Sequence, residues 1–214
     1  MKIKFKYISL LALALTFTLH IGGCSSKKVN ENDPKEMFED AESDIKNDRY
    51  LLALDKLRVV KNKFAYTSYG ALAQLKVADV YFLQESYPEA ASSYETFVEL
   101  FPKHEKAAYA LFRAGESQFL DIPSNTARDL KSAESTIQTF ELYSKKYPTG
   151  EHLQKAMEMK QLAYDRLAEK ELSIAEFYIK RKKFDSARLR INKILDNFST
   201  SSSAEKAKEL LKSL

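Results

Sequence analysis

Hydrophobic residues after position 33 recur at intervals of three and four, the spacing that places side chains on one face of an α-helix. Ala53, for example, is followed by Leu57 and Val60. No segment shows the sustained apolar–polar alternation of a β-strand, and only three of the five glycines lie in this part of the chain. The pattern therefore predicts an all-helical protein.

The predicted helical region begins with a helix-start signal. Asp33 can cap a helix with its carboxylate, Pro34 suits the first helical position, and Glu36 stands at the third. Polar residues without apolar periodicity precede this signal, which separates them from the folded part. We therefore expect one TPR-like helical domain (TPR, tetratricopeptide repeat) over residues 34–214.

Small residues divide this domain into repeats. In three pairs of alanines separated by twelve residues, an aromatic residue precedes the second alanine by three positions, and large apolar residues follow it at four and seven. The pairs are Ala41 and Ala53, Ala78 and Ala90, and Ala175 and Ala187. Small residues let two antiparallel helices approach closely, so each pair predicts a helical hairpin of the tetratricopeptide type.

The remaining pattern predicts a fourth hairpin and the end of the domain. Residues 130–140 repeat the pattern of a second helix, after a loop at residues 121–126 that is longer than the others. Residues 151–181 lack glycine and proline and predict one long helix. Residues 203–214 predict a short capping helix, on which Ala204 is expected to be exposed. The expected fold class is all-α, a TPR solenoid of about four helical hairpins plus a capping helix.

The first 23 residues have a different pattern. Three lysines precede an apolar stretch, residues 7–21, which is too short for a spanning helix and is followed by two glycines. This is the layout of a secretory signal. The run Ile21-Gly22-Gly23-Cys24 resembles the lipobox of bacterial lipoproteins, in which the cysteine carries lipid and becomes the mature N-terminus. An ordinary secretory signal or an anchored helix is the alternative.

The lipobox interpretation divides the N-terminal part into two segments. Residues 1–23 are a lipoprotein signal peptide, and residues 24–33 are a lipidated tether that reaches at most roughly 30 Å. Cys24 is the only cysteine, so it cannot form an internal disulfide, and we expect it to be the lipidation site. Ser25 after the cysteine implies transport to the outer membrane.

Loss of the signal also changes the charge balance. The whole chain has 34 Lys+Arg and 30 Asp+Glu, a formal net charge of +4. The signal contains three of the lysines and none of the acids, which leaves 31 against 30, or +1. A nearly neutral mature chain lacks the basic surface that nucleic-acid binding requires, so we expect no nucleic-acid partner.

Residues that could support catalysis are scarce. After the signal only His104 and His152 remain, and each lies near a predicted helix start beside a glutamate, where histidines are usually solvated. No metal-ligand, nucleophile-elbow or phosphate-loop motif occurs in the sequence. We therefore expect no enzyme, no catalytic residue, no cofactor and no metal.

One stretch carries a more specific resemblance. The segment YDRLAEKELSIAEFYIKRKKFDSA, residues 164–187, together with the lipobox and the repeats, resembles the BamD (ComL) family of outer-membrane β-barrel assembly lipoproteins. The resemblance covers the chain from Cys24 to about residue 211. It implies a scaffold in the Bam complex, lipid-anchored at the periplasmic face of the outer membrane.

The resemblance also implies partners. The C-terminal half would dock on the periplasmic POTRA region of the barrel-bearing insertase (BamA type). The N-terminal repeats would receive the C-terminal segments of unfolded outer-membrane proteins. Other Bam lipoproteins are further candidate partners, and the lipid anchor makes the membrane itself a partner.

Four residues are candidates for the substrate groove, because the first helices of such repeats line a concave face. They are Phe38, Ile45, Leu75 and Phe82. Glu42 and Asp79 lie among them in the sequence, so a peptide ending in an aromatic residue could place apolar groups there. The alternative is that these four side chains form the core between repeats.

Two arginines are candidates for partner docking. Arg188 and Arg190 lie off the predicted buried stripe of the last repeat, and arginine suits paired hydrogen bonding to a partner carboxylate. Arg190 also aligns with a basic position in the docking region of the BamD family. The lysine-rich stretch before them, residues 180–183, has a simpler explanation, since cations at a helix C-terminus favour its dipole.

Two other classes of protein fit the same sequence features. Another TPR lipoprotein, such as a pilotin that escorts a secretin or pilus component, or a cell-wall coordinator, would share the anchor and the repeats. A peptidoglycan or glycan hydrolase would require catalytic acids among the carboxylates spread over the helices. Co-purification separates the first of these from a Bam scaffold, and an assay on cell wall tests the second.

Overall fold

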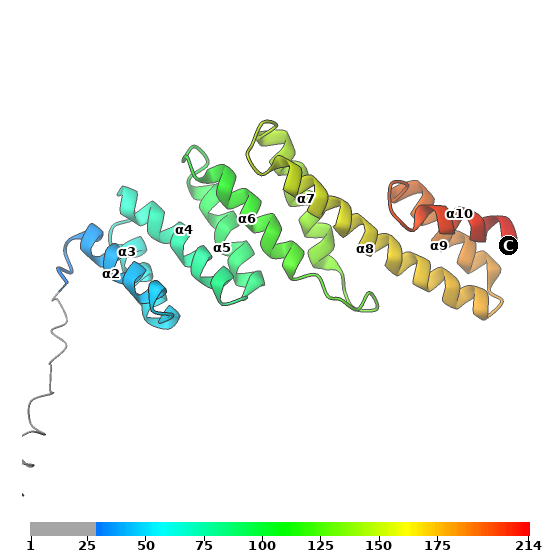
Figure 1. Cartoon of the computed structure of the whole chain (residues 1–214), viewed down its shortest axis with the longest axis horizontal. Helices are drawn as coiled ribbons and strands as arrows, with labels where there is room; N and C mark the ends of the chain where they lie inside the picture. The colour runs from blue at the N-terminus through cyan, green and yellow to red at the C-terminus, as the bar shows by residue number, and fades with distance from the viewer. Residues whose placement is uncertain (1–28) are drawn as a thin grey trace, which may run out of the picture. The chain divides into compact units, whose positions relative to one another are not determined.

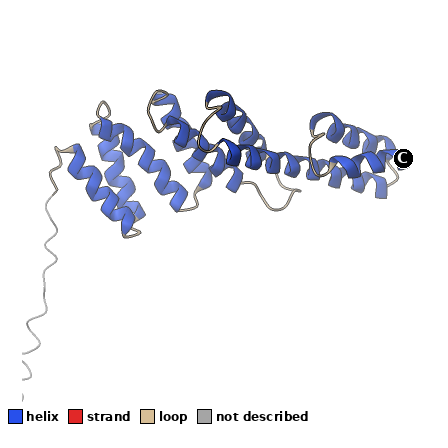
Figure 2. Cartoon of the chain, turned by 45° about the horizontal axis from the view of Figure 1, so that its top comes forward, coloured by secondary structure: helices blue, strands red, loops and turns tan. Residues whose placement is uncertain are grey.

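The structure is a computed structural model that describes residues 29–214, so the predicted signal peptide and Cys24 lie outside the described residues. Within residues 29–214 every regular element is a helix (Figures 1 and 2). The helices are α2 (Pro34–Lys46), α3 (Tyr50–Lys63), α4 (Ser68–Leu83), α5 (Tyr87–Leu100), α6 (Ala107–Leu120), α7 (Lys131–Lys146), α8 (Leu153–Lys180), α9 (Phe184–Asn197) and α10 (Ala204–Ser213). None of these helices combines the length and the hydrophobicity that crossing a membrane requires.

Consecutive helices pack as four hairpins, α2–α3, α4–α5, α6–α7 and α8–α9, and α10 packs on α9. Each hairpin also packs on the next one along the chain, and first helices of adjacent hairpins touch where α2 meets α4 and α6 meets α8. Stacking of helical hairpins on their neighbours is the arrangement of a repeat solenoid. The predicted all-α class, with four hairpins and a capping helix, is confirmed.

The alanine pairs lie where the two helices of a hairpin meet. All six alanines have a relative exposure of 0%, and in the second hairpin the neighbouring Tyr94 and Phe97 are also fully buried. In the third hairpin Gly115 of α6 replaces an alanine. A Cβ atom at Gly115 would lie 2.5 Å from the ring of Phe140 on α7, so only glycine fits at this crossing.

Three of the four hairpins share one turn geometry. The turn residues Asp48, Glu85 and Lys182 have positive φ angles of 56°, 57° and 55°, and each follows the first alanine of its pair by seven positions. In each turn the next amide donates to the carbonyl five residues earlier: Arg49 to Asp44 at 2.9 Å, Ser86 to Tyr81 at 3.0 Å, and Lys183 to Tyr178 at 3.0 Å. The third hairpin has the longer connection, residues 121–130, in place of this turn.

The two ends of the helical region test two finer predictions. At the start, Asp33 Oδ1 accepts hydrogen bonds from the amides of Lys35 and Glu36 at 2.9 and 3.4 Å, so the predicted helix cap forms. At the other end, the expectation that Ala204 is exposed is wrong, because its relative exposure is 4%. Ala204 lies three residues before the buried Ala207, on the face of α10 that packs inward.

Candidate partner-binding surfaces

A pocket of about 390 Å³ lies between the first helices α2, α4 and the start of α6. It is lined by Phe38, Glu42, Leu72, Leu75, Lys76, Asp79, Lys106 and Tyr109. Two of the four predicted groove residues, Phe38 and Leu75, therefore share one pocket, together with both predicted acids. Ile45 and Phe82 are partly buried but do not line it.

The floor of this pocket also belongs to the core. Phe38 and Leu75 are both buried, and the ring of Phe38 packs against that of Tyr69 with a centroid distance of 5.8 Å. The rim is charged, since Lys76 Nζ lies 3.7 Å from Glu42 and 3.4 Å from Asp79. The pocket thus has an apolar floor and a rim that offers both signs of charge.

Asp79 connects the pocket to the core of the second and third hairpins. Its Oδ1 atom accepts hydrogen bonds from the hydroxyl groups of Tyr94 on α5, at 2.7 Å, and of Tyr109 on α6, at 3.2 Å. Burial raises the pKa of the Tyr94 hydroxyl, and the negative charge of Asp79 raises it further; the same two causes raise the pKa of Tyr109. Both hydroxyls therefore stay protonated and hold the Asp79 carboxylate in place.

Arg113 on α6 extends these contacts. Its Nε donates to the Tyr94 hydroxyl at 3.4 Å, and its guanidinium carbon lies 3.5 Å from the centre of the Phe82 ring. Burial alone would lower the pKa of Arg113, but the hydrogen bond to Tyr94 and the negative charge of Glu116 raise it. Phe82 thus packs on Arg113 instead of facing the pocket.

Further polar contacts connect Arg113 to the last hairpin. Glu116 on α6 pairs with Arg113 through one carboxylate oxygen and with Lys155 on α8 through the other, both at 2.6 Å. The polar contacts therefore run along the first helices from Glu42 on α2 to Lys155 on α8. The sequence did not indicate this network, because its members are far apart in the chain and their acids and bases are of common types.

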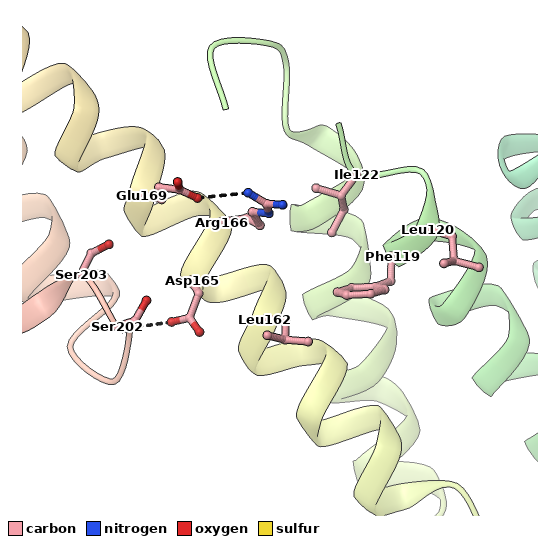
Figure 3. A pocket seen from close by; sticks show the side chains of 9 residues that line it. All are labelled: Phe119, Leu120, Ile122, Leu162, Asp165, Arg166, Glu169, Ser202 and Ser203. Carbon is pink, nitrogen blue, oxygen red and sulfur yellow. Dashed lines mark hydrogen bonds and ion pairs between the residues drawn. The ribbon is translucent and has the colours of Figure 1, made fainter. Parts of the chain in front are cut away.

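A larger pocket, of about 740 Å³, lies between the end of α6 and the middle of α8 (Figure 3). Its lining residues are Phe119, Leu120, Ile122, Leu162, Asp165, Arg166, Glu169, Ser202 and Ser203. Figure 3 shows three apolar side chains, Phe119, Leu120 and Ile122, on the α6 side, and the three charged side chains together with Leu162 on α8. Asp165 accepts a hydrogen bond from the Ser202 amide at 2.8 Å, and Arg166 lies 3.2 Å from Glu169.

A third pocket, of about 550 Å³, lies farther along α8, where residues 125–127 of the long connection face Ser173, Ile174, Phe177 and Tyr178. Lys170 also lines it and donates to the carbonyl of Arg128 at 2.7 Å. The stretch 164–187, which carries the family resemblance, contributes to both α8 pockets. Sequence reasoning missed these pockets; the long connection at residues 121–130 was the available signal, since extended loops commonly line binding surfaces.

The two predicted docking arginines have partners within the chain. Arg190 Nη1 donates to Glu171 on α8 at 3.0 Å, and Lys193 Nζ lies 2.5 Å from the other oxygen of that carboxylate. Burial alone would raise the pKa of Glu171, but the hydrogen bonds from Lys193 and Arg190 lower it. Arg188 pairs with Asp185 at 3.4 Å and donates to the backbone oxygen of Leu214.

We compared the sequence with known protein families and with individual proteins. Residues 30–213 match the family model YfiO, described as outer membrane lipoprotein. The chain belongs to this family. The match spans all four hairpins and α10, and it confirms the resemblance to BamD-type lipoproteins.

Several relatives of this outer membrane lipoprotein are named outer membrane protein assembly factor BamD. The chain is 25% identical to the protein of Vibrio cholerae over 97% of this chain and 89% of that one. It is 30% identical to the Rickettsia prowazekii protein, over 91% of this chain and 78% of that one. For Neisseria gonorrhoeae the identity is 21%, over 94% and 82%. In each case the similarity extends over most of both chains.

Within residues 29–214 of this outer membrane lipoprotein, no three His, Cys, Asp or Glu side chains are grouped so that they could hold a metal ion. His104 stacks edge-on against Phe97, and His152 stacks on Phe112. Both histidines therefore pack at the edge of the core near helix starts.

Proposed function

We propose that this outer membrane lipoprotein is a non-catalytic scaffold of the Bam complex, which assembles β-barrel proteins into the outer membrane. The names of its relatives, outer membrane protein assembly factors, support this role. In this proposal residues 1–23 are a signal peptide, Cys24 carries the lipid anchor, and residues 24–33 tether the helical domain to the periplasmic face.

The pocket between α2, α4 and α6 is the proposed site for the C-terminal segments of unfolded outer-membrane proteins. Its apolar floor, formed in part by Phe38 and Leu75, suits an aromatic or aliphatic side chain. The charged rim of Glu42, Lys76 and Asp79 can hydrogen-bond a peptide backbone or a terminal carboxylate. The presence of an apolar floor and a charged rim in one pocket is the observation that supports this assignment.

The last hairpin is the proposed docking site for the POTRA region of the barrel insertase. About a third of the Arg190 side chain is exposed, and a guanidinium has five N–H donors. One edge of Arg190 can therefore contact Glu171 while another donates to a carboxylate of the partner. Lys193 contacts the same carboxylate and adds positive charge beside Arg190, and Arg188 adds a further cation to the same helix.

Affinity purification of the lipidated protein from detergent-solubilised outer membrane tests the role in the Bam complex. We expect the barrel insertase to be recovered with it. Recovery of a secretin or pilus component, without the insertase, would contradict the proposal and indicate a pilotin.

Site-specific photo-cross-linking tests the pocket. A photoreactive residue at Leu72, which lines the pocket, should cross-link to a peptide with the C-terminal sequence of an outer-membrane protein. The same probe at the exposed Ser92 on α5, away from the pocket, is the control. Equal labelling at both positions would show that the peptide binds without using this pocket.

A further inference from the structure

The turn between α8 and α9 carries four consecutive cations, called here the basic turn: Lys180, Arg181, Lys182 and Lys183. All four side chains are exposed, at the end of α8 where the chain reverses into α9 (Figure 1). Across residues 29–214, no acidic side chain forms an ion pair with any of them. The acids nearest in sequence have other partners, since Glu176 pairs with Lys206 at 2.6 Å and Asp185 pairs with Arg188 at 3.4 Å.

A favourable interaction with a helix dipole explains only two of the four cations in the basic turn. Lys180 lies in the last turn of α8 and Arg181 is its C-cap, where a cation offsets the partial negative charge of the helix end. Lys183 is the N-cap of α9, and Lys182 directly precedes it. At that end the helix presents partial positive charge, so these two lysines are electrostatically unfavourable there.

The equivalent turns of the first two hairpins avoid this repulsion. At the N-cap position the first hairpin has Arg49, which pairs with Asp44 at 2.7 Å, and the second has the neutral Ser86. At the preceding position they have acids, Asp48 and Glu85, in the same backbone conformation. The turn geometry therefore does not require lysines, and its electrostatics favour other residues.

Two aromatic rings flank the basic turn. Phe177 and Phe184 have relative exposures of 49% and 43%, and the guanidinium of Arg181 lies 4.6 Å from the centre of the Phe177 ring. Cations next to exposed apolar rings are the surface chemistry by which proteins bind the headgroup region of anionic membranes. A free phosphate or a segment made only of acidic residues would neutralise the charge but leave both rings in water.

We propose that the basic turn is a binding site for the anionic phospholipid surface of a bilayer. The phosphate groups supply the missing counter-charges, and the rings of Phe177 and Phe184 enter the boundary between headgroups and acyl chains. Each basic residue near an anionic membrane surface contributes roughly a fivefold gain in binding. This attraction is weak alone, but it orients a domain that a lipid already holds at the membrane. The site does not depend on the role in barrel assembly.

A vesicle-binding experiment tests the proposal on the chain from residue 24 onward with Cys24→Ser, so that no lipid is attached. Residues 31–214 form a compact unit without the signal. The double variant Lys182→Glu/Lys183→Ser introduces the residues that the second hairpin has at Glu85 and Ser86. With vesicles of phosphatidylcholine and phosphatidylglycerol, we expect the unsubstituted chain to sediment with them at low salt. The variant should bind at least roughly twentyfold more weakly, because it loses two cations and gains a carboxylate. The thermal midpoint should not fall.

The matched control removes the same charge elsewhere. Lys145→Glu/Lys146→Ser, in the last turn of α7, should bind these vesicles much more tightly than the basic-turn variant. The proposal is overturned if the unsubstituted chain ignores phosphatidylglycerol, or if both double variants lose binding equally. It is also overturned if the basic-turn variant keeps vesicle binding but loses co-purification with the insertase, because the turn would then be a protein-docking surface.

Discussion

The guanidinium of Arg190 on α9 lies 3.0 Å from the carboxylate of Glu171 on α8, so a residue predicted to face a partner also joins the two helices of the last hairpin. Lys193 contacts the same carboxylate at 2.5 Å. Glu171 is buried, and it receives one cation on each oxygen. A test of docking at Arg190 must therefore separate the loss of a partner contact from the loss of this internal ion pair.

The substitution Arg190→Lys makes that separation. A lysine can keep a charge near Glu171, but it cannot donate in the two-pronged manner of a guanidinium. We expect the thermal midpoint to stay within about 2 °C of the unsubstituted value, while recovery of the insertase in a pull-down falls several-fold. Arg190→Glu would place two carboxylates together and should lower the midpoint, so it is not a clean docking test. Normal recovery of the insertase with Arg190→Lys would argue against Arg190 as the docking residue.

Glu171 predicts a pH dependence of stability. Its folded-state pKa is lowered from the ordinary value of 4.5, so its ion pairs stabilise the fold above that value. The stabilisation is lost as pH falls below 4.5 and through the lowered pKa. Glu171→Gln should therefore cost about 1.5–3 kcal/mol of unfolding free energy at pH 7, and the difference from the unsubstituted chain should shrink in acid. Denaturant unfolding of both chains at pH 7 and at a pH below 4.5 measures this difference in stability. A difference that is the same at both pH values would contradict the lowered pKa of Glu171.

The alanine crossings predict a cost for larger side chains. Ala90→Leu and Ala187→Leu each add volume where two helices meet and no surface is exposed, so each should lose about 1–3 kcal/mol of stability. Thermal melting should show midpoints several degrees lower. Ser92→Leu, on the exposed side of α5, is the control in place of the buried Ala204. Three equal midpoints would mean that the crossings tolerate bulk.

Gly115 predicts a compensating pair. Gly115→Ala forces a methyl group against the buried Phe140 ring and should destabilise the third hairpin by about 1–3 kcal/mol. Phe140→Leu shortens the opposing side chain, so the double variant should lose less stability than the sum of the two single variants. A double-mutant cycle by denaturant unfolding measures the coupling. Strict additivity would show that the two positions do not press on each other.

The proposed anchor predicts a change in processing. Cys24→Ala should remain uncleaved by the lipoprotein signal peptidase and should not incorporate labelled palmitate, because the thiol that carries the lipid is missing. Labelling in cells followed by membrane fractionation measures both effects. A variant that still takes up label and fractionates with the outer membrane would rule out Cys24 as the attachment residue.

The sequence by itself determined the repeat architecture. Helix boundaries and hairpin pairing depend on local signals, such as the Asp33 cap and the spacing of Ala78 and Ala90, which act over less than twenty residues. The short final helix was assigned to the right place, but its buried face was not, and Ala204 was expected on the wrong side. In ten residues the apolar stripe of a helix is too short to set its rotation without knowledge of the surface that it covers.

Only the tertiary structure decided which polar residues meet between helices. Asp79 contacts Tyr94 and Tyr109, and Arg190 contacts Glu171, at sequence separations of fifteen to thirty residues. Any of many acids and bases on the helix surfaces could have formed these pairs, because a helical period specifies a face and not a partner. The pockets beside α8 likewise depend on where the connection at residues 121–130 lies against that helix. Stacking angles and loop paths select these contacts, and both are set by packing over the whole domain.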